Sequence, residues 1–433
     1  MKWSIAVLTL CIASVHSQRI LDSLIKAPGD LLNGATNLLD GIFGGKTTDQ
    51  CAQDVTEDYT KAITAFYQKL YTNIAARRDY HFVFSPYTIW LSLSALAEGA
   101  DPAVQNQIFT SLNLPQQQCI RKKFYDIALN VERPGRDVSL KRRRILLLDE
   151  SLKVSPAWGK MAWSTGFLNV AYAPIKKDPK ATSRQVRSIL STRSHITLKG
   201  NSVLLDSLEY QGLWTTAFPD ADIQSQPFFN ELGQKIGTVD MMHIQKKVRL
   251  AHVPFMSAKV VELPVGVDGR YTMLIAVGTG NDMLKNAIQI FMGSIIEIFS
   301  LLQMSLFPLD VAIPRFAVTS EFDARPALEE FDIRSFWRDP AATRYVSYPP
   351  AAPGGLIQRV AIKVDNEGVS PPPQVGNDLI SGLVNIASDT ARGVARAAGH
   401  EFVADRPFMF ALFDTETRTC LFAGAFSRPN TLK

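Results

Sequence analysis

Near the C-terminus, a long run of polar and small residues separates two groups of apolar, strand-like segments. The first segment, residues 359–368, ends in an acidic turn, and the next ones follow at residues 402–413 and 420–426. Residues 369–401 between them are far more than a connection inside a compact domain needs, and connections of this length are usually functional or disordered. Residues 369–401 are therefore the first candidate for a functional region.

Three consecutive prolines stand near the start of this region, directly after Val369 and Ser370. Proline has no backbone N–H, so Pro371–Pro373 would remove three hydrogen-bond donors from any sheet in which they formed a central strand. The sequence thus predicts that these residues resist becoming such a strand.

Short motifs recur in a characteristic order after about residue 55. They are Phe84–Ile89 with an Ala- and Leu-rich helix to Glu98–Ala100, Gly212–Trp214 with Phe218, Met241–Met242, Glu262–Pro264 and Pro314–Phe316. Together with the C-terminal strands, these motifs resemble the serpins, and residues 369–401 correspond to the reactive-centre loop of that family. The resemblance implies an α+β serpin fold with three β-sheets, about nine helices and an exposed loop. Mixed helices and strands without a regular βαβ alternation also favour an α+β architecture.

The resemblance implies how the loop would act. In an inhibitory serpin, a protease acylates the loop, which then inserts as a new central strand of sheet A and distorts the protease. The hinge of the loop here consists of Glu367, Gly368, Val369, Ser370 and Pro371–Pro373. Its prolines stand where insertion must begin, so we expect a non-inhibitory member that binds a protein partner at the loop or assembles copies. The alternatives are an inhibitor of a trypsin-like extracellular serine protease and a carrier of a small apolar ligand.

Two buried polar positions under sheet A depart from the family pattern. The family usually has Asn and His there, whereas this chain has Asp206 and Gln358. These differences bear on the opening of the sheet rather than on the fold.

The middle of the loop has the pattern of an amphipathic helix. Apolar residues recur every three or four positions over residues 378–398, and two glycines interrupt them. The polar face carries Arg392 and Arg396, which are the candidate scissile residues for a trypsin-like protease. Residues 30–38 resemble the first residues of this helix. This similarity reflects either two unrelated amphipathic segments or a partner surface that both share.

Apolar periodicity locates the main elements. Residues 55–76 and 86–97 are expected to be helices, and the apolar stretch 287–302 is expected to be a buried helix rather than a membrane span. Strands are expected at residues 145–148, 259–263, 271–277 and 360–364.

No catalytic or cofactor-binding pattern occurs in the sequence. The six His residues include none in a metal-ligand spacing, and there is no nucleophile elbow, phosphate-binding loop or dinucleotide fingerprint. We therefore expect no enzymatic activity, no metal and no cofactor, and we interpret His243 and His252 as structural.

The N-terminus has the composition of a secretory signal peptide. Lys2 precedes an apolar run from Trp3 to Ala13, which is too short to span a membrane, and small residues follow as a cleavage site. We divide the chain into a signal peptide (1–17), an amphipathic, Gly-containing extension (18–50) and a single serpin domain (51–433). A secreted, extracellular protein without a transmembrane anchor is expected.

Cysteine usage fits an oxidising compartment. Loss of the signal peptide leaves Cys51, Cys119 and Cys420. In some serpins the N-terminal tail is tied to the region of Cys119, so the resemblance implies a Cys51–Cys119 disulfide, which would stabilise the fold by about 4 kcal/mol. Cys420 lies in an apolar run and is expected to be an inert core thiol.

Lys and Arg residues outnumber acidic ones between residues 121 and 144. This segment corresponds to helix D and the start of strand 2A, where some serpins bind sulfated polysaccharides. Basic patches attract polyanions, and the Arg side chain suits sulfate, although a solvated face is the simpler alternative. The candidate polyanion-binding residues are Arg121, Lys122, Lys123, Lys141, Arg142, Arg143 and Arg144. Nucleic acid is not an expected partner, because no interleaved aromatic residues accompany the basic ones.

Overall fold

The structure is a computed structural model that describes residues 51, 53–133, 136–194, 196–279, 283–372 and 401–429. Several sequence-based predictions lie outside the described residues. These are the signal peptide (1–17), the N-terminal extension (18–50), Pro373, the helix expected at residues 378–398, and the candidate scissile residues Arg392 and Arg396.

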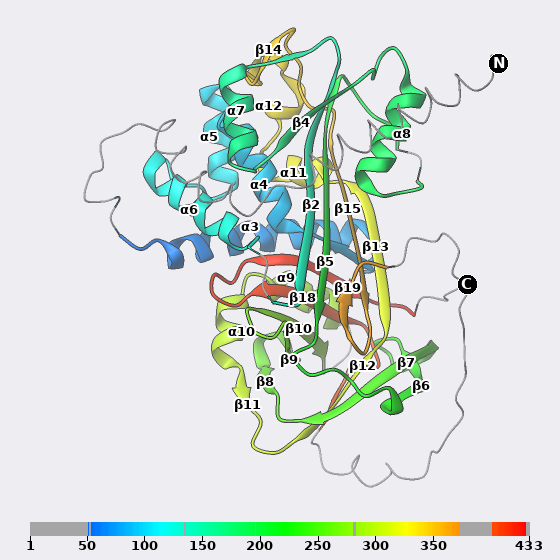
Figure 1. Cartoon of the computed structure of the whole chain (residues 1–433). Coiled ribbons are helices and arrows are strands. Elements are labelled where there is room, and N and C mark those ends of the chain that lie inside the picture. The colour runs from blue at the N-terminus through cyan, green and yellow to red at the C-terminus, as the bar shows by residue number, and fades with distance from the viewer. Residues whose placement is uncertain are drawn as a thin grey trace, which may run out of the picture.

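A six-stranded sheet runs along the length of the molecule (Figure 1). It includes the first residues of the hinge as a short strand. Its strands, in spatial order, are β13 (Phe316–Asp323), β15 (Leu356–Val364), β16 (Gly368–Ser370), β5 (Ser202–Leu213), β2 (Val138–Asp149) and β4 (Asn169–Ala173). The strands expected at residues 145–148 and 360–364 fall within β2 and β15.

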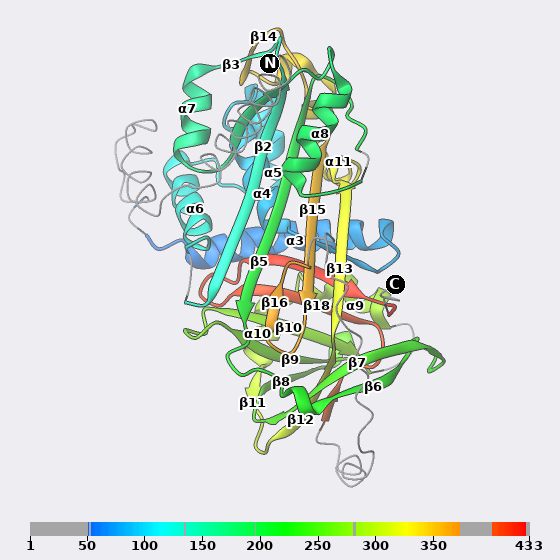
Figure 2. The same cartoon turned by 45° about the vertical axis from the view of Figure 1, so that its right-hand side comes forward.

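Two further large sheets pack at the end of the molecule where β16 lies (Figure 2). The seven-stranded sheet has the order β1 (Phe82–Phe84), β19 (Cys420–Phe426), β18 (Phe408–Asp414), β10 (Tyr271–Gly278), β9 (Ala258–Val265), β8 (Arg249–Val253) and β11 (Gln303–Met304). The four-stranded sheet has the order β17 (Glu401–Val403), β12 (Leu309–Pro314), β7 (Lys235–Lys246) and β6 (Ile223–Phe229), and β14 (Val346–Tyr348) pairs separately with β3 (Lys153–Val154).

Ten α-helices occur among the described residues. They are α3 (Thr56–Arg77), α4 (Pro86–Ala97), α5 (Pro102–Ser111), α6 (Gln118–Asn130), α7 (Pro156–Ser164), α8 (Pro179–Leu190), α9 (Met283–Phe291), α10 (Ile295–Leu301), α11 (Arg325–Leu328) and α12 (Ser335–Arg338). The two helices expected at residues 55–76 and 86–97 are confirmed as α3 and α4. The mixed α+β architecture expected from the sequence is thus present.

Helix α4 lies between the six-stranded sheet and the rest of the core, and every one of its residues is buried. The side-chain oxygen of Ser85 accepts a hydrogen bond from the Thr88 backbone N–H (3.3 Å), and Pro86 occupies the first turn. Both features favour a helix start, because the Ser side chain satisfies an unpaired donor and proline needs none there. Because the helix begins at a defined residue, its polar side chains lie at fixed positions beneath β5 and β15.

The prediction of a single buried helix over residues 287–302 is wrong, because the chain forms two helices, α9 and α10, with a bend of 99° between them. Glycine weakens a helix, and the Gly293 N–H donates to Gln68 Oε1 of α3 (2.5 Å) instead of continuing a helical ladder. No single described helix is long and apolar enough to cross a membrane. The bent pair α9–α10 has the length and apolar composition of a span only when its two helices are taken together.

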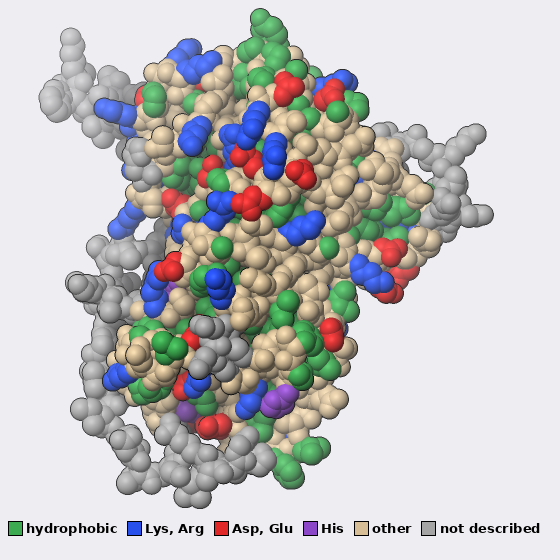
Figure 3. All heavy atoms as spheres, turned by 180° about the vertical axis from the view of Figure 1, so that it is seen from behind, with side chains coloured by type: hydrophobic (Ala, Val, Ile, Leu, Met, Phe, Trp, Pro, Cys, Tyr) green, Lys and Arg blue, Asp and Glu red, His purple; other side chains and the backbone are tan. Residues whose placement is uncertain are grey.

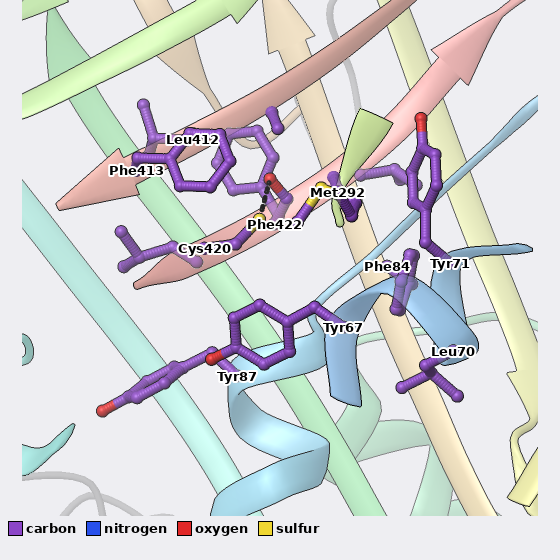
Figure 4. Packing of buried hydrophobic residues seen from close by; sticks show 14 of the residues in the cluster. Tyr67, Leu70, Tyr71, Phe84, Tyr87, Met292, Leu412, Phe413, Cys420 and Phe422 are labelled. Atoms are coloured by element: carbon purple, nitrogen blue, oxygen red, sulfur yellow. Dashed lines mark hydrogen bonds between the residues drawn. The ribbon is translucent and has the colours of Figure 1, made fainter. Parts of the chain in front are cut away.

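The core around the C-terminal strands is aromatic and encloses the remaining thiol. Figure 4 shows Cys420 near Tyr67, Phe413 and Phe422, and its thiol donates a hydrogen bond to the Phe422 carbonyl (3.3 Å). Burial raises the pKa of the Cys420 thiol well above its usual range, so the thiol stays protonated at neutral pH. The expectation of a buried, unreactive Cys420 agrees with this environment.

The disulfide that the resemblance implied is present between Cys51 and Cys119, whose Cα atoms lie 5.9 Å apart. It joins the start of the described domain to α6. A loop with a sequence separation of 68 residues is closed by this bond.

Candidate functional site

The acidic turn after β15 reverses the chain sharply. Asp365 Oδ1 accepts hydrogen bonds from the backbone N–H groups of Glu367 (3.0 Å) and Gly368 (3.2 Å), and Asp365 also pairs with Lys363 (2.8 Å). Partial burial opposes ionisation, but the Lys363 ammonium and these N–H groups together lower the pKa of Asp365. The turn therefore holds an ionised carboxylate that directs the chain back along β15.

After this turn the hinge enters the six-stranded sheet as β16. Val369 is opposite Val364 of β15 on one side and Gly212 of β5 on the other, with antiparallel pairing to both strands. Its side chain is only 1% exposed. Figure 2 shows the short strand β16 between β5 and β15. The first hinge residues are thus already part of the sheet, which the sequence had not indicated.

Gly368 is required for this entry. A Cβ atom at this position would lie 2.1 Å from the Gly212 carbonyl oxygen and 2.8 Å from Leu213 Cα. Real Cβ atoms do not approach backbone atoms so closely, so only glycine fits without moving β5. The hinge glycine therefore allows close contact between two backbones.

The Gly212–Trp214…Phe218 motif at the end of β5 binds the turn from the other side. The Trp214 backbone N–H donates to the Glu367 carbonyl (2.8 Å), and its indole Nε1–H donates to the Asp365 carbonyl (2.8 Å). The Phe218 N–H donates to the Asn366 carbonyl (2.9 Å). The Gly212–Trp214…Phe218 motif thus positions the hinge.

β16 ends at Ser370, the residue before the first proline. Beyond it, β5 and β15 pair directly and in parallel over residues 204–208 and 356–360. We call the point where these two strands separate, next to Leu208 and Val360, the fork. If the register of β16 continued, Pro371 and Pro372 would lie inside the fork and Pro373 would meet Leu208 and Val360 at its apex. The prolines thus lie where an inserted strand would have to begin separating β5 from β15.

A buried polar cluster joins β5 and β15 in the region where these two strands pair directly. Gln358 of β15 and Asp206 of β5 are register partners, and Gln358 Nε2 donates to Asp206 Oδ1 (3.1 Å). Gln358 Oε1 accepts from the Ser85 N–H (2.9 Å), while its amide nitrogen also donates to the Ser85 carbonyl (2.9 Å). Thr88 Oγ1 donates to Asp206 Oδ1 (2.6 Å), and Ser92 Oγ donates to Oδ2 (3.4 Å). These contacts join β5, β15 and α4 directly below the fork.

The Asp206 carboxyl is almost completely buried at 1% exposure. Burial raises its pKa to about 6, although hydrogen bonds from Thr88, Gln358 and Ser92 and the positive charge of Arg144 oppose this change. Arg144 is opposite Asp206 on β2, but its guanidinium is bound to Glu132. The cluster therefore contains an acid that titrates near pH 6.

The polyanion-binding role predicted for two of the basic residues is wrong, because their side chains are buried and already paired. Arg121 Nε contacts Glu98 Oε1 (3.0 Å), and Arg144 Nη1 contacts Glu132 Oε1 (2.5 Å). Their side chains are only 7% and 2% exposed, so neither reaches a ligand at the surface. Their role is to pair with buried carboxylates.

The remaining basic candidates do not form one uniform patch. Arg142 pairs with Glu132 (2.6 Å) and Arg143 with Glu209 (2.8 Å), while Lys123 Nζ donates to the Gln53 carbonyl (2.5 Å). Lys122 is half-buried and Lys141 is exposed. Along β2, neighbouring residues point to opposite faces of the sheet, so Arg142 and Arg144 share the face on which Glu132 lies, while Lys141 and Arg143 lie on the other.

Comparisons with known proteins agree with the sequence resemblance. A family model described as "Serpin (serine protease inhibitor)" matches residues 61–429. Serpin B5 of Rattus norvegicus is 22% identical over 395 residues, which cover 85% of this chain and 98% of that protein. A putative non-inhibitory serpin-10 of Oryza sativa subsp. japonica is 24% identical over 417 residues, which cover 88% of this chain and 99% of that protein. The structure of human thyroxine-binding globulin complexed with thyroxine matches with a TM-score of 0.72 and 15% identity, covering 87% of this chain and 100% of that one.

Proposed function

This chain belongs to the serpin superfamily, and we propose that it is a secreted member that does not complete loop insertion. It would act as a binding or assembly protein rather than as an efficient protease inhibitor. The observation that carries the proposal is that β16 ends at Ser370, directly before Pro371. The Cys51–Cys119 disulfide supports an extracellular location, because such bonds persist in oxidising compartments.

Prolines cannot make the backbone hydrogen bonds that an inserted strand requires. A central strand gives each N–H to a neighbouring carbonyl, so three inserted prolines would leave three carbonyls of β5 and β15 without donors. Each unsatisfied buried group costs about 1–3 kcal/mol. Insertion through Pro371–Pro373 is therefore disfavoured by roughly 3–9 kcal/mol relative to a loop with ordinary residues.

Opening the fork adds a second obstacle. The strand must separate Val360 from Leu208 and then Gln358 from Asp206, which would break the polar cluster on α4. Freed but still buried polar groups cost free energy until new partners replace them. The prolines and the polar cluster thus oppose insertion at successive positions.

A protease challenge tests the proposal. The purified full chain is mixed with an active trypsin-like protease, and separately with the same protease inactivated at its nucleophile. We expect loop cleavage by the active protease without an SDS-stable adduct and without a large increase in unfolding temperature. A stable adduct near one-to-one stoichiometry, absent with the inactivated protease, would establish the inhibitor alternative instead.

Substitution of the prolines separates the two obstacles. The variant with Pro371→Ala, Pro372→Ala and Pro373→Ala restores three donors and leaves the polar cluster intact. We expect the cleaved variant to gain thermal stability relative to the cleaved natural chain. An equal unfolding temperature for both cleaved proteins would mean that removing the prolines is not sufficient for insertion and that the polar cluster is enough to stop it.

The association itself is proposed to use residues 378–398, which lie outside the described residues. Deleting them should abolish binding to a partner or to a second copy while the unfolding temperature changes little. Association that survives the deletion, measured by sedimentation, would move the binding surface elsewhere on the chain.

A further inference from the structure

Large apolar side chains project from the segment that connects α10 to β12. Leu306 is 83% exposed, Phe307 65% and Met304 59%. Figure 3 shows hydrophobic side chains standing out at the lower end of the molecule. Contiguous exposed apolar side chains on a folded protein commonly mark an interaction site. We call Met304, Leu306 and Phe307 the apolar corner.

Hydrogen bonds hold the backbone of the apolar corner in place. Met304 of β11 is the register partner of Arg249 of β8. The Ser305 N–H donates to the Val248 carbonyl (2.9 Å), and Ser305 Oγ donates to the Phe307 carbonyl (2.8 Å). β11 is also the last strand of the seven-stranded sheet, so no described strand pairs with its outer edge. The apolar side chains are therefore displayed on a fixed edge of the molecule.

The long loop ends beside the apolar corner. β17 is the first described element after the loop, and its first residue, Glu401, is the parallel register partner of Asp310 in β12. Asp310 follows Phe307 by three positions in the chain. Three extended residues and one strand spacing place the end of the loop within roughly 15 Å of the corner. Each copy thus carries the base of its loop and its apolar corner at the same end of the molecule.

The loop segment proposed above to mediate association has the chemistry of an apolar partner. The helix expected over residues 378–398 has large apolar residues in its first half, at Ile380, Leu383 and Val384, and mostly alanines along the apolar stripe of its second half. It contains two Asp and two Arg residues, so its formal charges cancel. A helix of this kind binds by burying its apolar stripe in an apolar surface.

Charges of both signs surround the apolar corner. Lys247 lies at the junction of β7 and β8, whereas Glu297 of α10 and Asp310 of β12 carry carboxylates on the two sides of the segment. The surroundings therefore favour neither a strongly acidic nor a strongly basic ligand. A helix without net charge suits them, and apolar burial is expected to supply most of the binding free energy.

Within one copy, the helix would meet the corner with its small residues. Only Gly399 and His400 separate residue 398 from β17. Leu383 lies 15 positions before residue 398, which is about 22 Å along a helix and exceeds the roughly 15 Å between β17 and the corner. Alanines would therefore face Leu306 and Phe307 in the same copy, whereas the large residues can reach them in a second copy.

We propose that the apolar corner of one copy binds the first half of the loop helix of a second copy. This inference rests on the proposed association through residues 378–398 and names the surface that receives them. Because the loop base and the corner lie at the same end of each copy, two copies can make the contact reciprocally. A reciprocal contact closes a twofold dimer, whereas a one-way contact would continue into a filament.

Sedimentation of the full natural chain over a range of protein concentrations tests the dimer. Leu306→Ser with Phe307→Ser should weaken dimerisation at least roughly tenfold, because two large side chains no longer leave water. Both side chains are exposed, so the unfolding temperature should not change. The matched control is Leu232→Ser, which removes a 67% exposed side chain between β6 and β7 and should leave the dimer intact. A natural chain that stays monomeric at every concentration would overturn the proposal.

Mixing two variants tests the loop-to-corner contact directly. The first variant lacks residues 378–398 and keeps the corner, while the second keeps the loop and carries Leu306→Ser with Phe307→Ser. Neither should form a dimer alone, but the mixture should contain a one-to-one heterodimer held by the single intact contact. Absence of this heterodimer at the highest concentration used would refute the contact.

The same measurements separate this inference from the proposed function on which it rests. If deletion of residues 378–398 abolishes association but the corner variant associates normally, the loop binds another surface and only this inference is wrong. If association survives the deletion, the proposed role of the loop is wrong as well. Dimerisation should change little between low and high salt, and strong weakening by salt would contradict an apolar contact.

Discussion

Ionisation of Asp206 is expected to destabilise the folded protein as the pH rises. The carboxyl titrates at a pKa of about 6 in the folded chain, against 3.8 without its environment. The folded state therefore binds a proton more tightly than the unfolded state. The stability from the neutral carboxyl is complete below about pH 4 and is lost as the pH rises through about 6.

The size of this effect follows from the difference in pKa. A difference of roughly two pKa units corresponds to roughly 3 kcal/mol of unfolding free energy. Asp206→Asn removes the titration while keeping an amide oxygen that accepts from Thr88 and Gln358. Asparagine is also the residue that serpins usually have here. We expect the variant to be more stable than the natural chain by up to roughly 3 kcal/mol at pH 7, with little difference at pH 4.

Urea unfolding over pH 4 to 7.5, followed by tryptophan fluorescence, measures this difference. Asp149→Asn is the matched control, because Asp149 is buried but its pKa is lowered. Burial opposes that shift, and hydrogen bonds from Ser151 and the Lys176 N–H outweigh it. Removing this carboxylate should destabilise the protein at neutral pH and matter less in acid. A free-energy difference between Asp206→Asn and the natural chain that stays constant over this pH range would contradict a raised pKa for Asp206.

Three further expectations concern the hinge, the disulfide and the basic residues. Gly368→Val should displace β16 from the sheet, because the valine Cβ would lie 2.1 Å from the Gly212 carbonyl oxygen. Backbone hydrogen exchange in β16 should then become faster, and unchanged exchange would contradict this expectation. Reduction of Cys51–Cys119 should lower the free energy of unfolding by about 4 kcal/mol, and a non-reducing peptide map that shows Cys420 in a bridge would contradict the pairing. Lys141→Gln should weaken salt-sensitive heparin retention, whereas Arg144→Met should instead lower stability by roughly 3 kcal/mol; equal elution of both variants would remove Lys141 from the proposed site.

The sequence predicted the elements whose signals are local. Periodic apolar residues located α3 and α4, and the prolines predicted that residues 371–373 resist forming a strand. β16 itself was not predictable by periodicity, because it is three residues long and depends on contact with Gly212, far away in the chain. The break between α9 and α10 was missed because apolar periodicity continues through Gly293, whose N–H is bound by α3.

The roles of charged residues were harder to predict from the sequence than the positions of apolar ones. Arg121 and Arg144 have the same local sequence signal as exposed basic residues, and only the fold brings Glu98 and Glu132 beside them. Asp206 and Gln358 were recognised as unusual from the family pattern, but their mutual hydrogen bond depends on the parallel register of β5 and β15. Long-range pairing thus decided which polar residues form the site.

Helix α8 has a hydrophobic cluster of its own, separate from the main core. The cluster joins α8 to β2, β4 and β5, and its members are Ile145, Leu147, Ala173, Val186, Ile189, Leu190, Ile196, Val203 and Leu205. Proteins open in cooperative units whose opening free energies follow the apolar contacts that each unit loses. We therefore expect α8 to separate from the sheet at a lower free-energy cost than α4, whose residues are all buried. Such an opening would expose the apolar residues of β2, β4 and β5 that α8 covers, while α4 and the aromatic core stay intact.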